Sequence, residues 1–289
     1  MSSPIATTNP FSSTPRVGCD SAPTINSRQT VLGFGEMPAA YNQPVSRSET
    51  SLALTSEAES SPDSSARIPS WKRILDISCV ALSLPIWLPI MIAIAVWIKL
   101  VSSGPILFRQ ERVGYRGKSF QILKFRTMKA NAETLSHERH LEGLIQADCA
   151  MTKLDAAGDP RIIRGGRLLR ATGLDELPQL FNVLQGEMTL VGPRPCTPNE
   201  FRRYQPWQQA RTNAAPGLTG YWQVNGKNKT TFTEMINLDI FYAKNMSLRL
   251  DLAILLRTVP AIFGELLEAR AAKLAGQAGT SNPPESCSQ

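Results

Sequence analysis

The chain has 289 residues, a length that suits one large domain or two modest ones. Hydrophobic residues make up 42% of it and charged residues 19%, which argues against a wholly disordered chain, a coiled coil and a polytopic membrane protein. The formal net charge of +7 is compatible with three kinds of partner: nucleic acid, an anionic membrane surface or a phosphate-bearing substrate.

The N-terminal quarter differs in composition from the rest. Residues 1–70 contain 15 Ser, 7 Thr and 8 Pro and have neither Lys nor Trp. We therefore predict that they form a disordered tail. This segment has four arginines and six acidic residues, a charge of −2, so residues 71–289 carry +9.

An apolar run follows the tail. Ile77–Ile98 is 22 residues long without a charge, which predicts a membrane segment. Pro85 and Pro89 lie four residues apart on one face and predict a pronounced bend. The residues alone slightly favour a straight span over a helix that returns to the same face, because membrane helices often tolerate proline. Positive charge at both ends gives no clear direction for a span: Lys72, Arg73 and Lys99.

Two short strands are predicted after the membrane segment, at residues 106–108 and 120–125, with Gly114 and Gly117 in the connection. Basic residues are dispersed through this hairpin, and one interpretation is that they face solvent or lipid headgroups. From Met128 to Ala157 the chain is polar and predicts an exposed helix and a loop. Its two histidines, at 137 and 140, suit a solvated helix surface better than a metal site. The five cysteines are scattered without a CxxC pair, which indicates a reducing compartment.

The section richest in candidate chemistry runs from Arg161 to Pro195. On a helix, the arginines at steps of three would place several guanidinium groups along one side, suited to phosphate oxygens: Arg161, Arg164, Arg167 and Arg170. A solvated amphipathic helix is the alternative.

Gly173 predicts the end of that helix, and Asp175 and Glu176 would open the next one, with Pro178 in its first turn. Acidic residues at such a position are most often caps, but here the rigid Gly192–Pro195 segment could aim Arg194 inward. Two adjacent carboxylates can also bind Mg²⁺ together with substrate phosphates. These parts together predict a diphosphate site.

Several motifs of this chain closely resemble the bacterial sugar transferases of exopolysaccharide assembly, the small monotopic phosphoglycosyl transferases. They are KRILD, the Pro-broken apolar run, RQERVGYRGKSFQILKFRTM, GLDELPQLFNVLQGEMTLVGPRP, PGLTGYWQVNGKN and the DIFYAKNMSLRLDLAILLRT tail. The resemblance covers about residues 71–260, and the motif from Asp175 to Pro195 is its most specific part.

The resemblance implies a fold and a domain order. It implies a helix-rich α+β chain with an N-terminal re-entrant membrane helix, a β-hairpin and a cytoplasmic catalytic domain with interfacial amphipathic helices. The bend at Pro89 then becomes a membrane break, in place of the straight span. The domains are a disordered cytoplasmic tail at 1–70, the membrane helix at 71–100, the catalytic domain at 101–265 and a disordered C-terminal tail at 266–289.

The resemblance also implies a function. It is the transfer of a sugar 1-phosphate from a UDP-sugar to undecaprenyl phosphate, with release of UMP, at the cytoplasmic face of the bacterial inner membrane. Asp175 would be the nucleophile and Mg²⁺ ligand, with Glu176 as its companion, while Arg170 and Arg194 would hold substrate phosphate. The partners are the two substrates, the lipid bilayer and later glycosyltransferases of the same pathway.

Two positions depart from the family pattern, and two other function classes remain. Gly173 and Leu88-Pro89 stand where members often have Ser and Ser-Pro. A catalytically silent scaffold of a polysaccharide assembly complex is the main alternative. A nucleic-acid-binding protein is disfavoured, because no helix-turn-helix or zinc spacing occurs. For Trp222, packing or membrane anchoring is favoured over stacking on uracil. No residue identifies the sugar.

Overall fold

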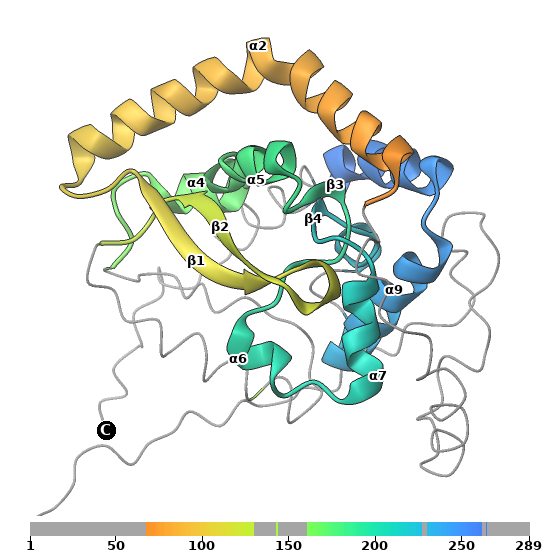
Figure 1. Ribbon diagram of the computed structural model, residues 1–289. Helices are drawn as coiled ribbons and strands as arrows, with labels where there is room; N and C mark the ends of the chain where they lie inside the picture. Colours follow the sequence, from red (N-terminus) through yellow and green to blue (C-terminus); the bar gives the residue numbers. More distant parts are fainter. Residues whose placement is uncertain (1–67, 130–142, 144–160, 227–229, 262–263, 265–289) are drawn as a thin grey trace, which may run out of the picture.

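The computed structural model describes residues 68–129, 161–226 and 230–261, together with the isolated residues 143 and 264 (Figure 1). Nearly all of the predicted tails, 1–70 and 266–289, lie outside these ranges, so their boundaries stay predictions. The same holds for most of the polar segment 128–157, which includes both histidines.

One long helix, α2 (Ser70–Val101), contains the predicted membrane segment. It is long and apolar enough to cross a membrane, by length and composition. One face packs on the protein body through a stripe at helical spacing: Val80, Trp87, Met91, Ile94 and Ile98. The opposite face is exposed although it is apolar, with Leu82 84%, Ile86 68% and Leu100 77% exposed. A helix that is apolar on both faces is expected where lipid covers the outer one.

α2 is bent near its middle, and its two arms slope from the bend toward the body (Figure 1). Pro85 and Pro89 lie inside the helix. Each proline removes one backbone hydrogen bond. Two side chains bond to carbonyl groups just before the bend: the Ser83 hydroxyl donates to Cys79 O over 2.7 Å, and the Trp87 indole donates to Val80 O over 3.0 Å. The predicted bend is therefore confirmed, and Ser83 and Trp87 make additional bonds to the helix backbone next to it.

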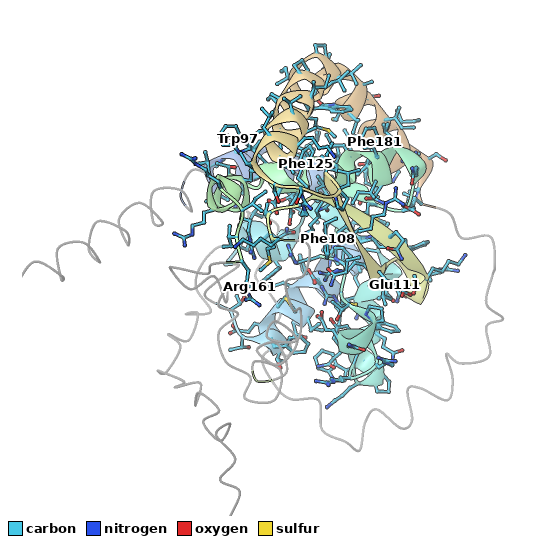
Figure 2. The ribbon with its side chains drawn as sticks, turned by 90° about the vertical axis from the view of Figure 1, so that its left-hand side faces the viewer. Trp97, Phe108, Glu111, Phe125, Arg161 and Phe181 are labelled. Atoms are coloured by element: carbon cyan, nitrogen blue, oxygen red, sulfur yellow. The ribbon has the colours of Figure 1, made fainter. Side chains whose placement is uncertain are left out.

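The predicted hairpin is confirmed and is longer than expected. β1 (Leu107–Val113) pairs antiparallel with β2 (Ser119–Phe125), and a one-turn helix, η2 (Tyr115–Gly117), joins them. The register sets Leu107 opposite Phe125 and Val113 opposite Ser119. Phe125 and Phe181 lie beneath α2 in Figure 2, and both belong to the apolar cluster on which α2 packs.

The rest of the body consists of short helices and one pair of parallel strands. β3 (Thr189–Val191) and β4 (Gly217–Thr219) run parallel in register. The remaining elements are α4 (Gly166–Thr172), η3 (Leu174–Glu176), α5 (Gln179–Gln185), α6 (Pro198–Phe201), α7 (Pro206–Gln209), η4 (Ala210–Asn213), α8 (Tyr221–Val224), α9 (Phe232–Asn245) and a helical segment at residues 248–261. A second apolar cluster, around α9, includes Tyr204, Trp222, Phe232 and Ile254.

Buried polar contacts fix the first turns of α2 to the body. Lys72, fully buried, forms an ion pair with Asp251 and donates to Tyr242 Oη over 2.8 Å. Asp76 Oδ1 accepts a hydrogen bond from the Leu190 amide of β3 over 2.9 Å. Arg73 donates to the carbonyl groups of Val183 and Leu184 near the end of α5. The start of the apolar helix is thereby part of the folded core.

Candidate active site

The two adjacent carboxylates lie between two short helices. Asp175 and Glu176 belong to η3, which follows α4 directly. Gly173 ends α4 with φ of 71°, in the left-handed region that favours glycine. A serine at this position would therefore be strained. The glycine that departs from the family pattern is thus suited to the turn.

The prediction that the carboxylates open a helix needs correction. They lie in a single 3-10 turn, and α5 starts only at Gln179 with Pro178 as its N-cap residue. Because proline has no N–H group, regular helical bonding begins after it. The charge of the carboxylates therefore depends on neighbouring side chains more than on a helix terminus.

The predicted row of four helical arginines is also wrong. Gly165 has φ of 79°, and α4 begins at Gly166, so Arg161 and Arg164 precede the helix. The Ile163 amide donates to Thr127 O over 3.0 Å, which ties this stretch to the chain after β2. Only Arg167 and Arg170 lie on α4.

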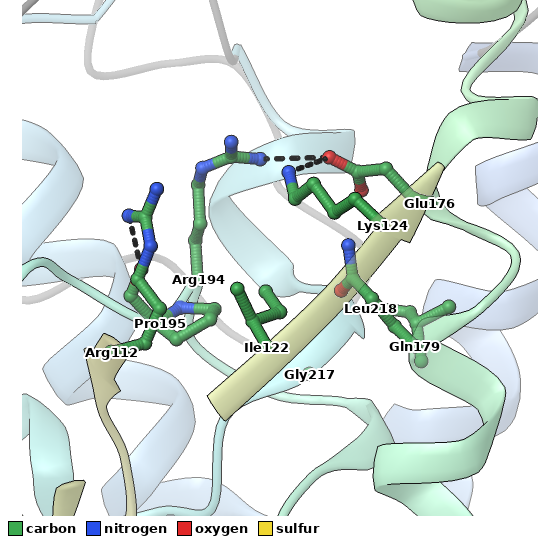
Figure 3. Close-up of a pocket in the computed structure, with 9 residues that line it drawn as sticks. All are labelled: Arg112, Ile122, Lys124, Glu176, Gln179, Arg194, Pro195, Gly217 and Leu218. Carbon is green, nitrogen blue, oxygen red and sulfur yellow. Dashed lines mark hydrogen bonds and ion pairs between the residues drawn. The ribbon is translucent and has the colours of Figure 1, made fainter. Parts of the chain in front are cut away.

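Glu176 joins two cations from distant parts of the chain (Figure 3). Lys124 Nζ of β2 donates to Glu176 Oε1 over 2.7 Å, and Arg194 Nη1 lies 3.7 Å from the same oxygen. Arg194 comes from the loop after β3 and is 41% exposed, so its guanidinium group is accessible to a ligand. The structure therefore brings Glu176 and Arg194 together, as the sequence predicted, and adds Lys124.

The pKa of Asp175 is raised. Burial raises its pKa to about 6, and the negative charge of Glu176 adds to this effect. Lys124 and Arg170 lower it in part, which places Arg170 within electrostatic reach of Asp175. All four predicted residues thus belong to one cluster. A half-buried carboxylate of raised pKa beside cations is typical of a functional site.

Asn182 of α5 holds the hairpin near the two adjacent carboxylates, Asp175 and Glu176, which we call the dyad. Its Oδ1 accepts from the Leu123 amide over 3.0 Å, and its Nδ2 donates to Gln121 O over 2.8 Å. Because these two backbone groups flank Ile122, two residues before Lys124, they fix this part of β2 against α5.

Contacts with Ala215 and Arg211 fix the loop that carries Arg194. A Cβ atom on Gly192 would lie 2.1 Å from Ala215 O, so only glycine allows this close approach. Arg211, 2% exposed, donates to Arg194 O over 2.9 Å. Its guanidinium group also donates to Asp239 Oδ2 over 2.5 Å and to Tyr204 Oη over 2.6 Å. Burial raises the pKa of Asp239 to about 6, although Arg211 opposes this shift.

The donor set is compatible with Mg²⁺ held partly by substrate. Within the described residues, no group of three or more His, Cys, Asp or Glu side chains converges on one point. Since Glu176 Oε1 is engaged by Lys124, Asp175 is the better candidate ligand. Mg²⁺ commonly uses one or two carboxylates and takes its other ligands from phosphates and water.

Three residues near the dyad were not singled out from the sequence: Lys124, Arg112 and Gln179. The alternation of side chains along the hairpin could have indicated Lys124 and Arg112. Arg112 pairs with Phe120 and therefore lies on the same face as Ile122 and Lys124. The prediction for Trp222 is settled by its burial. It is 5% exposed and its indole donates to Thr230 Oγ1 over 2.6 Å, so it packs in the core.

Comparison with known proteins agrees with this geometry. The model of the bacterial sugar transferase family matches residues 67–265. The chain belongs to the bacterial sugar transferase family. This membership confirms the family predicted from the motifs and the prediction of a transferase enzyme.

Individual relatives carry more specific names. The exopolysaccharide production protein ExoY of Sinorhizobium fredii is 35% identical over 191 residues, which are 66% of this chain and 84% of the relative. A UDP-glucose:undecaprenyl-phosphate glucose-1-phosphate transferase of Caulobacter vibrioides is 43% identical over 199 residues, 66% of this chain and 69% of the relative. An undecaprenyl-phosphate galactose phosphotransferase of Salmonella typhimurium is 40% identical over 192 residues, but the chain spans only 40% of that relative.

Proposed function

We propose that this transferase moves a sugar 1-phosphate from a UDP-sugar to undecaprenyl phosphate and releases UMP, initiating exopolysaccharide or related glycan assembly. The observation that carries the proposal is the cluster of Asp175, Glu176, Lys124 and Arg194, with Arg170 close by. Phosphoryl transfer depends mainly on positioning and on cations that neutralise spread negative charge. The names of the relatives in Caulobacter and Salmonella support the acceptor.

The chemistry proceeds in two displacements. An ionised Oδ atom of Asp175 attacks the sugar-bearing β-phosphorus, and the bond from that phosphorus to the bridging oxygen breaks, so UMP leaves with the electron pair. A phosphate oxygen of undecaprenyl phosphate then attacks the same phosphorus and frees the Asp175 carboxylate. A covalent intermediate divides one difficult displacement into two easier ones.

The surrounding residues have distinct tasks in these steps. Arg170 and Arg194 hold phosphate oxygens, and Lys124 holds Glu176 in place through their 2.7 Å contact. Asp175 would also bind Mg²⁺, which when bound offsets the repulsion between a carboxylate and the incoming diphosphate.

The second substrate is a lipid, and the exposed apolar surface of the protein suits it. We propose that α2 enters the inner membrane from the cytoplasmic side, bends at Pro89 and returns, so that the catalytic domain docks at the cytoplasmic interface. The segment 248–261 supports docking, because Leu252, Leu256 and Val259 are exposed at helical spacing while Ile254 is buried. A polyprenyl phosphate at that interface would present its headgroup to the site.

Isotope transfer tests the reaction. Enzyme is incubated with UDP-sugars labelled in the sugar, across glucose, galactose and N-acetylated hexoses, and label is followed into organic-extractable lipid. Omitting the acceptor should leave label on the protein, and supplying it before the quench should remove that label. Asp175→Asn should lose both signals, whereas Glu176→Gln keeps a carboxylate at 175 and should retain some adduct. No label in lipid with any sugar would favour the silent scaffold.

Cysteine accessibility tests the topology. Single cysteines at the exposed positions Ser70 and Ser119, in a cysteine-free background, are exposed to an impermeant maleimide in intact cells. A re-entrant helix leaves both positions protected until the inner membrane is permeabilised. Labelling of only one of them in intact cells would mean that α2 spans the membrane.

A further inference from the structure

The hollow beside the dyad carries an excess of positive charge. Its lining includes three cations, Arg112, Lys124 and Arg194, and one carboxylate, Glu176 (Figure 3). Burial lowers the pKa of Lys124, and the positive charges of Arg194 and Arg112 add to this effect against the pull of Glu176. An anionic ligand would relieve this mutual repulsion.

Two buried nitrogen atoms of residues that line this hollow lack a hydrogen-bond partner. Among the described residues, four buried side-chain nitrogen or oxygen atoms have none, and two of them, Arg112 Nε and Gln179 Nε2, belong to residues that line this hollow. A buried donor without an acceptor destabilises a protein, so most such groups are satisfied. Two unsatisfied donors in one cationic hollow indicate that a ligand supplies the acceptors.

Gln179 is the more informative of the two residues. It is 2% exposed and is the first residue of α5, three positions after Glu176. In Figure 3 its amide nitrogen points to the side on which Lys124 and Arg194 end. An uncharged amide offers hydrogen atoms without repelling the cations around it, and it suits an oxygen that has those cations as its other partners.

We propose that Gln179 is a substrate-binding residue that donates a hydrogen bond from Nε2 to a phosphate oxygen in this hollow. Which substrate supplies the oxygen rests on the proposed function: it is either the diphosphate of the UDP-sugar or the phosphate of the lipid acceptor. The two share the same chemistry, and the two Michaelis constants distinguish them.

The test replaces the amide by an apolar side chain of similar length. Gln179→Met is compared with Gln185→Met, the same change at an exposed position of the same helix. Because methionine lacks the unpaired buried N–H group of Gln179, Gln179→Met should have an unchanged or higher Tm without ligand. Equilibrium binding of inorganic pyrophosphate and of UMP to the detergent-solubilised full chain should weaken at least about 10-fold, as expected for one hydrogen bond to a charged group. Gln185→Met should bind as the parent does.

Kinetics then identify the substrate. A KM for the UDP-sugar raised about 10-fold or more, with the KM for polyprenyl phosphate within about twofold, assigns Gln179 to the diphosphate, and the reverse pattern assigns it to the acceptor. A lower Tm for Gln179→Met would identify a structural amide and overturn the proposal, as would unchanged binding of every anion. If the parent transfers no sugar yet binds pyrophosphate more tightly than Gln179→Met, the subsite stands and the proposed function fails.

Discussion

Arg211 donates a hydrogen bond to the backbone carbonyl of Arg194. We therefore predict that a variant of Arg211 loses more catalytic activity than its loss of stability explains. Arg211→Lys keeps a positive charge beside Asp239, but one ammonium group cannot reach the Asp239, Tyr204 and Arg194 acceptors together. A hydrogen bond from a charged group contributes about 1.5–3 kcal/mol to stability, and this contribution is lost with the bond. If the misplaced Arg194 then binds the transition state about 1.4 kcal/mol less tightly, kcat/KM for the UDP-sugar falls about tenfold.

A neighbouring variant gives the matched control. Tyr204→Phe removes the hydroxyl that joins Arg211 to Glu200, yet leaves the bond from Arg211 to Arg194 O. It should lower the free energy of unfolding by about 1–3 kcal/mol, as a buried polar loss does, while kcat/KM stays within about twofold. Urea unfolding and initial rates of UMP release measure the two quantities. If both variants lose kcat/KM equally for equal loss of stability, Arg211 acts only through general stability and the positioning role is wrong.

Three further outcomes follow from the site and the bend. Because burial and Glu176 raise the pKa of Asp175 to about 6 and a carboxylate must be ionised to act as the proposed nucleophile, kcat/KM should fall about tenfold per pH unit below 6. Removing the positive charge in Lys124→Met should move this limb to higher pH, and Glu176→Gln should move it to lower pH; a limb that stays in place in both would refute the assignment. Chelation with EDTA should abolish protein-bound label without changing the Tm, and added Mg²⁺ should restore it. Trp87→Phe, which loses the indole donor to Val80 O, should lower stability by about 1 kcal/mol in thermal unfolding, whereas the exposed Trp97→Phe, which loses a longer bond of 3.2 Å to Arg164 O, should change it less.

Local signals predicted the elements well. Two prolines four residues apart predicted the bend in α2, and Gly173 predicted the end of α4 because it can adopt positive φ. The hairpin followed from short apolar runs around glycine. The wrong prediction that Arg161 and Arg164 lie on a helix also has a local cause, because Gly165 in a left-handed conformation delays the start of α4.

Contacts between distant residues were beyond the reach of these patterns. Lys124 and Glu176 are 52 residues apart, and Arg211 and Asp239 are 28 apart, so no helical or strand period connects them. The motif from Asp175 to Pro195 placed Glu176 and Arg194 in one site, but the buried arginine that holds Arg194 from behind has no sequence signature of its own. Its role follows only from the tertiary arrangement.

The attachment of α2 to the body has a consequence for preparing this protein. Deleting the apolar helix would leave the Asp251 carboxylate without its lysine and the Leu190 amide without its acceptor. It would also remove the α2 side chains from the apolar cluster that they form with Ile122, Phe125, Val183 and Met188. A water-soluble fragment starting after Val101 should therefore aggregate or remain unfolded, because the anchor is at the same time one wall of the core. Under the proposed topology, membrane insertion of α2 and folding of the transferase are coupled, and a detergent that covers the exposed apolar face of α2 should keep the folded enzyme in solution.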